Sequence, residues 1–114
     1  MNNLSNSVRL TGRLGAAPEM KFLDEDRKVA KISLATNFYR KNGKGEPVQE
    51  THWHQLVLWN KNAEVAEKYM DKGSQIAVEG RLANRFYTDQ DGAKHFVTEI
   101  IVHEVMLLGK PVQS

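Results

Sequence analysis

The 114-residue chain contains no cysteine. This absence excludes disulfide scaffolds, thiolate nucleophiles, and zinc or iron–sulfur sites with cysteine ligands. Long apolar runs are missing too, since runs such as Leu56–Trp59 and Val105–Leu108 are far too short to span a bilayer. The first ten residues, MNNLSNSVRL, have neither the basic start nor the apolar stretch of a secretory signal. We therefore expect a soluble, cytoplasmic protein.

Motifs of common enzyme classes are also absent. The sequence has no H-E-x-x-H, no phosphate-cradling glycine loop and no G-x-S-x-G. His52 and His54 share one strand face, but neither His95 nor His103 stands at a spacing diagnostic of a metal site. We expect no enzyme activity, no cofactor and no metal site. His54 is expected to be a hydrogen-bonded core or interface residue.

Composition and charge indicate a single globular domain. Hydrophobic residues make up 40% of the chain and charged residues 26%, as in an ordinary folded protein. The length suits one domain that covers residues 1–114. The formal net charge of +2 is compatible with binding a polyanion, yet many enzymes show a similar excess. Charge alone does not identify a ligand.

Most of the chain alternates between apolar and polar residues, which predicts β-strands. Gly12 in the first strand marks an expected bend or bulge. Asp89–Gly92 is expected to form the turn of the last hairpin. The predicted strands are Val8–Leu14 with a short continuation at residues 20–22, Val29–Tyr39, Gln49–Trp59, Gln75–Thr88 and Ala93–Leu108.

Apolar residues at helical spacing predict one short helix between the third and fourth strands. Asn60 or Asn62 can cap its start, and Gly73 is a stop signal at its end. The stripe expected to face the core comprises Ala63, Val65, Ala66, Tyr69 and Met70.

This order of elements predicts an all-β fold. Five strands with one helix between the third and fourth match a five-stranded Greek-key barrel of the OB type. An SH3-like barrel also has five strands, but it offers no obvious place for a full helix at that point. We therefore predict an OB-fold barrel.

The third predicted strand carries two tryptophans on one side. Alternation places Trp53 and Trp59 on one face and Leu56 and Leu58 on the other. Because a small barrel has one interior, we expect the leucines to fill it. The tryptophans then lie outside, where either a loop or a second subunit covers them, or they form a stacking platform for unpaired bases.

Further aromatic residues stand beside basic ones at the end of the second strand and near the tip of the last hairpin. OB folds that bind oligonucleotides combine these types, because rings stack on bases and cations follow the phosphates. The candidate rings are Phe38, Tyr39, Phe86 and Tyr87, and the candidate cations are Arg40, Lys41, Lys44, Lys61, Lys72, Arg81 and Arg85.

An ordered series of motifs resembles bacterial single-stranded DNA-binding proteins over about Val8 to Val102. The motifs are Val8–Gly15 followed by Pro18-Glu19, Leu34–Thr36, Glu50–His54, Ala63–Ala66, Lys72–Gln75 and Val78–Leu82.

The resemblance implies an OB fold, a homotetramer, and nucleoid-associated binding and protection of single-stranded DNA in replication, recombination and repair. The family's base-stacking positions correspond to Tyr39, Trp53, Trp59 and Tyr87. The position of His54 corresponds to a subunit-interface histidine.

Two further expectations concern partners. The family recruits repair and replication enzymes through an acidic tail, whereas Gly109–Ser114 has no acidic side chain. We expect such tail-dependent partners not to bind this chain. The alternative function is that of a tailless docking module, like the dimeric primosome replication-restart protein that resembles this family. The oligomeric state and the DNA footprint separate the two functions.

Overall fold

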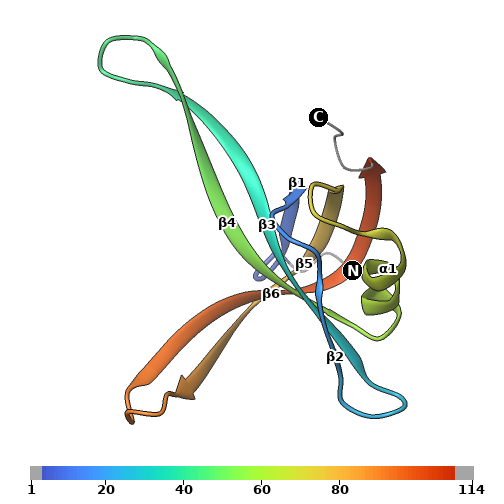
Figure 1. Ribbon diagram of the computed structural model, residues 1–114. Helices are drawn as coiled ribbons and strands as arrows, with labels where there is room; N and C mark the ends of the chain where they lie inside the picture. The colour runs from blue at the N-terminus through green and yellow to red at the C-terminus, as the bar shows by residue number, and fades with distance from the viewer. Residues whose placement is uncertain (1–3, 110–114) are drawn as a thin grey trace.

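The computed structural model describes residues 4–109, which form a small β-barrel from which hairpins project (Figure 1). The last five residues of the chain, on which the expectation about tail-dependent partners rests in part, lie outside the described residues. No helix in residues 4–109 is long and apolar enough to cross a membrane. The elements are β1 (Val8–Leu14), β2 (Glu19–Phe22), β3 (Lys28–Lys41), β4 (Pro47–Trp59), α1 (Lys61–Tyr69), β5 (Gln75–Thr88) and β6 (Lys94–Gly109).

The strands form one sheet that closes on itself. Its order is β1-β5-β6-β4-β3-β2, and β1 also pairs with β3 at Arg13 and Leu14. Between residues 4 and 109 the strand pairings are antiparallel except for the short contact of β4 with β6, where Val57 lies opposite Ile101. The predicted OB-fold barrel, with its helix after the third predicted strand, is confirmed. The predicted first strand is divided into β1 and β2, and among the described residues β2 pairs with β3 alone, at the edge of the sheet.

Even-numbered side chains fill the interior of the barrel, except beyond the bulge in β6, where Val105 packs against the core. The largest of them are at most 1% exposed: Ile32, Leu34, Leu56, Leu58 and Ile76. Burial of one such side chain contributes about 1.5–3 kcal/mol to folding. The prediction that the leucine face of β4 is the core is therefore confirmed. Val57, on the other face, is also buried, since Lys31 and Ile101 flank it on the neighbouring strands.

Helix α1 packs small residues against the core of the barrel. Ala63 and Ala66 are fully buried, and Met70, which follows the helix, is 6% exposed. The prediction for Tyr69 is wrong, because its side chain is 66% exposed. At about 100° per residue, Tyr69 lies about 90° from the mean direction of the two buried alanines. The helix ends before Met70, which is extended and turns into the core, so Gly73 belongs to the following loop.

Asn60 occupies the predicted N-cap position, but its side chain does not cap the helix. Instead its Oδ1 accepts a hydrogen bond from the backbone N–H of Lys28 at 3.3 Å. Its own N–H donates to the carbonyl of Lys28 at 3.0 Å. The residue has φ 52°, a conformation that asparagine adopts more readily than most residues. Asn60 therefore ties the start of α1 to β3.

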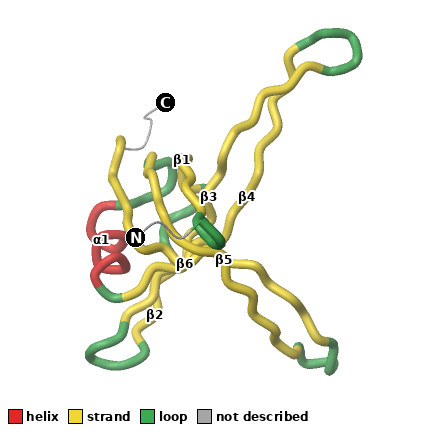
Figure 2. The backbone as a smooth tube through the Cα atoms, turned by 180° about the vertical axis from the view of Figure 1, so that it is seen from behind, coloured by secondary structure: helices red, strands yellow, loops and turns green. Residues whose placement is uncertain are grey.

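Two hairpins extend well beyond the barrel (Figures 1 and 2). The β3–β4 hairpin reaches Lys41 and Pro47, two residues further on each strand than predicted. The β5–β6 hairpin ends in the predicted turn, where the Gly92 N–H donates to the carbonyl of Asp89 at 3.1 Å. The radius of gyration is 16.1 Å, above the value of about 13 Å for a compact chain of this length. Both faces of these arms are open to solvent along much of their length.

Gly12 lies where β1 crosses β3 and closes the barrel. Of the predicted bend or bulge, the bulge is not found there, since Gly12 pairs in regular register with Ile76. The register shifts fall between β5 and β6 instead. A Cβ on Gly12 would lie 2.2 Å from the carbonyl oxygen of Ala35, a contact that side chains do not make. The glycine is needed for close backbone approach.

We expect Gly12→Ala to destabilise the barrel by about 1–3 kcal/mol, because the backbone of β3 must move to admit the methyl group. Urea unfolding followed by circular dichroism measures this change. Gly43→Ala is the matched control, since a Cβ there meets no atom within 4 Å. Its stability should stay within about 0.5 kcal/mol of the parent. Equal stability of the two variants would contradict this account of barrel closure.

Candidate nucleic-acid interface

The β3–β4 hairpin presents three of the predicted stacking rings on one side. Trp59 pairs with Val29, Trp53 with Ala35, and Tyr39 with Gln49. Directly opposed residues share a face, and so do residues two apart on a strand. All three rings therefore lie on the side opposite the core leucines, and they are 40%, 57% and 66% exposed in that order. We call this side of the sheet the outer face.

Tyr87 lies on the same outer face, although it belongs to the other arm. Ile101 of β6 pairs with Val57 of β4 and with Arg81 of β5. Arg81 therefore lies on the outer face, and Tyr87 follows it by six residues with no register shift between them. The four predicted stacking positions thus share one side of a continuous sheet, although the arms that carry two of them diverge (Figure 2).

The rings on β3 and β4 form a line rather than a cluster. Trp53 and Trp59 are six residues apart on one strand, which is about 20 Å at the usual rise. Tyr39 lies opposite Gln49, four residues beyond Trp53, which adds about 14 Å. A path of this length suits a chain of several nucleotides better than a single small molecule, since OB folds cover about 4–16 nucleotides.

The Trp53 ring packs on a glycine and lines a cleft. A Cβ on Gly15 would lie only 2.4 Å and 2.6 Å from two carbons of the Trp53 ring, so the ring packs directly on the glycine backbone. The cleft beside it has a volume of about 230 Å³ and lies between β4 and the β5–β6 arm. Its lining combines apolar and polar side chains: Trp53, His54, Gln55, Leu82, Thr98 and Ile100.

Basic side chains accompany the rings on the outer face. The predicted cations Lys41, Arg81 and Arg85 lie there by register. Sequence reasoning missed Lys21 and Lys31 on this face. Lys31 of β3 pairs with Val57 of β4. Lys21 of β2 pairs with Val29 of β3, which in turn pairs with Trp59. For Lys31 the alternation of its own strand was a usable signal, since it lies an even number of residues from Tyr39.

Three other predicted cations lie in loops or at a helix start. Lys61 is the first residue of α1, two residues after Trp59. Lys72 is exposed in the loop before β5, where the N–H of Gly73 donates to the carbonyl of Leu14 at 2.8 Å. This bond places Lys72 near Gly15 and hence near Trp53. Lys44 lies in the turn at the tip of the β3–β4 arm.

Phe38 and Arg40 lie on the side of the β3–β4 arm that faces away from the outer face. Phe38 pairs with Glu50 in register, and its ring meets His52 edge-on at 6.3 Å. Arg40 donates to the Glu50 carboxylate, and this hydrogen bond lowers the pKa of Glu50. The structure therefore separates these two candidates from Tyr39 and Lys41.

Phe86 is separated from Tyr87 in the same way. It pairs with Phe96, and the two rings are 5.2 Å apart on the side away from the outer face. Phe96 was not among the predicted residues, although its position in an alternating strand opposite Phe86 is a usable signal. This arm therefore carries aromatic residues on both sides.

Arg85 is both a candidate phosphate ligand and a structural residue. Its guanidinium donates to the Glu99 carboxylate at 3.0 Å, which raises the pKa of Arg85. Glu99 is only 9% exposed, so the guanidinium pairs with a largely buried carboxylate. The same guanidinium lies 5.8 Å from the centre of the Tyr87 ring. Arg85 thus contacts both Glu99 and the Tyr87 ring.

His54 lies on the inner side of β4, opposite Leu34. Its Nε2 is 2.9 Å from Oγ1 of Thr36. Partial burial lowers the pKa of His54, and the charge of His52 lowers it further. The ring is therefore mainly neutral at pH 7. Within residues 4–109, no three histidine, aspartate or glutamate side chains are grouped closely enough to hold a metal ion.

We expect Gly15→Ala to displace the Trp53 ring, because the new methyl group would overlap two ring carbons. In a Trp59→Phe background, Trp53 is the only tryptophan. Quenching of its fluorescence by acrylamide should increase when the ring no longer packs on the glycine. Gly43→Ala in the same background should leave quenching unchanged. Unaltered quenching in the Gly15→Ala variant would show that the glycine does not position the ring.

Comparison with known proteins agrees with this geometry. A single-stranded DNA-binding protein of Xanthomonas campestris pv. campestris is 39% identical over 104 residues, which are 91% of this chain and 60% of the relative. One of Xanthomonas axonopodis pv. citri is also 39% identical, over 91% of this chain and 58% of its own length. The chain thus spans less than two thirds of the length of these curated relatives.

A solved structure, described as a Plasmodium falciparum SSB complex with ssDNA, aligns with a TM-score of 0.82 and 34% identity. The alignment covers 95% of this chain and 99% of that one. Residues 5–108 match the model of the Single-strand binding protein family. The chain belongs to the Single-strand binding protein family.

Proposed function

We propose that this protein binds single-stranded DNA without regard to sequence, and so covers and protects it during replication, recombination and repair. Bases stack on Tyr39, Trp53, Trp59 and Tyr87, while lysine and arginine side chains of the outer face contact the phosphates. The observation that carries the proposal is the register that brings these four exposed rings to one side of the sheet.

Stacking explains why the rings are exposed. A large aromatic side chain in water loses the stabilisation that burial would provide. An unpaired base offers a π-face that restores it, at about 1–3 kcal/mol for each base, whatever the base. Lys21, Lys31 and Lys41 lie on the same side and are placed to neutralise phosphates along the line of rings.

The two adjacent rings at the end of β3 provide the sharpest test. Tyr39→Ala should weaken binding of an oligo-dT by about 1–3 kcal/mol, because it removes a ring from the outer face. Phe38→Ala is the matched control, since it removes a neighbouring ring from the opposite side of the same arm. Titration followed by fluorescence anisotropy measures both affinities.

Trp53→Ala and Trp59→Ala should lose affinity to a similar extent as Tyr39→Ala, whereas Tyr69→Ala at the end of α1 should not. Circular dichroism confirms that each variant folds. Equal losses from Phe38→Ala and Tyr39→Ala would argue that DNA contacts both sides of the arm. No loss from any outer-face ring would refute the stacking proposal.

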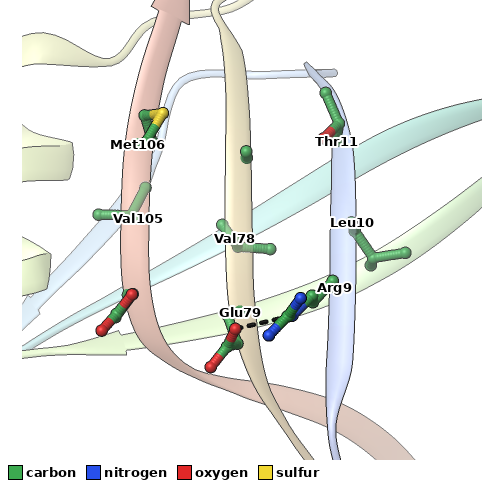
Figure 3. A pocket seen from close by; sticks show the side chains of 9 residues that line it. Arg9, Leu10, Thr11, Val78, Glu79, Val105 and Met106 are labelled. Atoms are coloured by element: carbon green, nitrogen blue, oxygen red, sulfur yellow. Dashed lines mark hydrogen bonds and ion pairs between the residues drawn. The ribbon is translucent and has the colours of Figure 1, made fainter.

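We also propose that the chain assembles as a homotetramer, through two kinds of symmetric contact. Apart from its last two residues, β1 pairs only with β5 within residues 4–109, and Gly12 already contacts β3. One edge of Val8–Thr11 is therefore open to a second copy. Beside this edge lies a groove of about 400 Å³ across β1, β5 and β6 (Figure 3). Met106, 63% exposed, lines it together with the Arg9–Glu79 ion pair. The second proposed contact includes His54.

Light scattering at micromolar concentration should give the mass of four 13.0 kDa chains. Met106→Glu places a charge in the groove beside Glu104 and should shift the mass towards smaller species. His54→Tyr should make assembly more sensitive to dilution while the barrel stays folded. A stable monomer of the parent protein would refute the tetramer. A stable dimer with a short footprint on oligo-dT would favour the replication-restart docking module.

A further inference from the structure

A row of side chains runs along the outer face of the β5–β6 hairpin, from the barrel to the turn. It begins with the ion pair between Glu99 and Arg85, whose guanidinium lies beside the Tyr87 ring. The Tyr87 ring is stacked on the imidazole of His95, with centroids 5.0 Å apart and planes inclined by 20°. The Nε2 atom of His95 lies 2.6 Å from Oδ2 of Asp89 in the turn.

Hydrogen bonds in the turn stabilise the ionised form of the Asp89 carboxylate. Its Oδ1 accepts hydrogen bonds from the backbone N–H groups of Asp91 and Ala93, both at 2.9 Å. The hydrogen bond from His95 and these backbone donors lower the pKa of Asp89. The carboxylate is therefore ionised near neutral pH, and an ionised carboxylate only accepts hydrogen bonds.

This geometry defines the tautomer of His95. Because Oδ2 of Asp89 can only accept, Nε2 of His95 must carry the hydrogen. Nδ1 is then the nitrogen that gains or loses a proton. The side chain is 45% exposed, so it is accessible to a ligand on the outer face. A protonated Nδ1 donates a hydrogen bond, whereas a neutral one cannot.

We propose that His95 is a further DNA-contacting residue, whose protonated Nδ1 donates to a phosphate of the strand that stacks on Tyr87. The proposal rests on the proposed function and adds a residue that neither the aromatic pattern nor the basic residues of the sequence indicate. Stacking on Tyr87 and the bond to Asp89 hold the imidazole in place, so little side-chain entropy is lost when the phosphate binds.

The contact makes DNA affinity depend on pH. A bound phosphate places a second anion beside the imidazolium, and this favours the protonated form in the complex. Binding therefore takes up a proton, and the affinity rises as the pH falls from about 8 to about 5.5. The charged or titratable groups that face His95 are Tyr87 and, diagonally, Arg85 from β5, and Asp89 from the turn.

The test measures oligo-dT affinity at constant salt between pH 8 and pH 5.5 for the parent protein and three variants. Between pH 8 and pH 5.5, the rise in oligo-dT affinity should be about threefold smaller for His95→Gln than for the parent. His95→Arg carries a permanent charge and should bind at pH 8 as tightly as the parent does at pH 5.5. His103→Gln removes a histidine eight residues further along β6 and should keep the parent profile.

Coinciding profiles for the parent and His95→Gln would overturn the proposal. So would nitrogen-15 NMR spectra that show the Nδ1–H tautomer of neutral His95 in the free protein. These outcomes do not bear on the proposed function. Binding of oligo-dT at pH 8 by the parent and all variants supports single-strand binding, whatever the pH profiles are. Failure of the parent to bind oligo-dT at any pH would refute both.

Discussion

The crossing of β1 over β3 at Gly12 closes the sheet into a barrel, and closure decides which side of every strand is inside. Once the even-numbered residues of β3 and β4 fill the interior, their odd-numbered residues must face outward. Through the short parallel pairing of Val57 with Ile101, the odd-numbered residues of β5 near Arg81 share this outer face. The outer face, with its four rings, therefore follows from the packing of the core.

The two hairpin arms lack packing partners within the part of the chain that the structure describes. Beyond the barrel, the β3–β4 hairpin has no interior to fill, and its cross-strand contacts are polar or aromatic, such as the hydrogen bond from Thr51 to Asn37. Isolated two-stranded hairpins are marginal in water. A nucleic-acid strand laid along such a ribbon supplies stacking and charge neutralisation that the chain does not supply for itself. The exposed arms and the binding activity we propose thus have one physical explanation.

Alternation in the sequence predicted the strands, the leucine core, and the outward position of Trp53 and Trp59, because the side-chain period of a strand is two. The order of five strands and one helix then predicted the barrel. Alternation alone did not reveal that Lys21 lies on the same face as Trp59, nor that Tyr87 and Trp53 share a side, because both depend on register between strands. The contact of His95 with Asp89 depends on how a turn folds back. Tyr69 was misplaced because it lies at the margin of a short helical stripe.

The central claim is that one side of the sheet carries the DNA. Ultraviolet crosslinking of the protein to oligo-dT, followed by mass spectrometry of the crosslinked peptides, tests it most directly, because crosslinks form where rings and bases are in contact. The account predicts crosslinks at the outer-face rings Tyr39, Trp53, Trp59 and Tyr87, and few at Phe38, Phe86 and Phe96. Crosslinks concentrated at these three phenylalanines would place the strand on the opposite side and contradict the account.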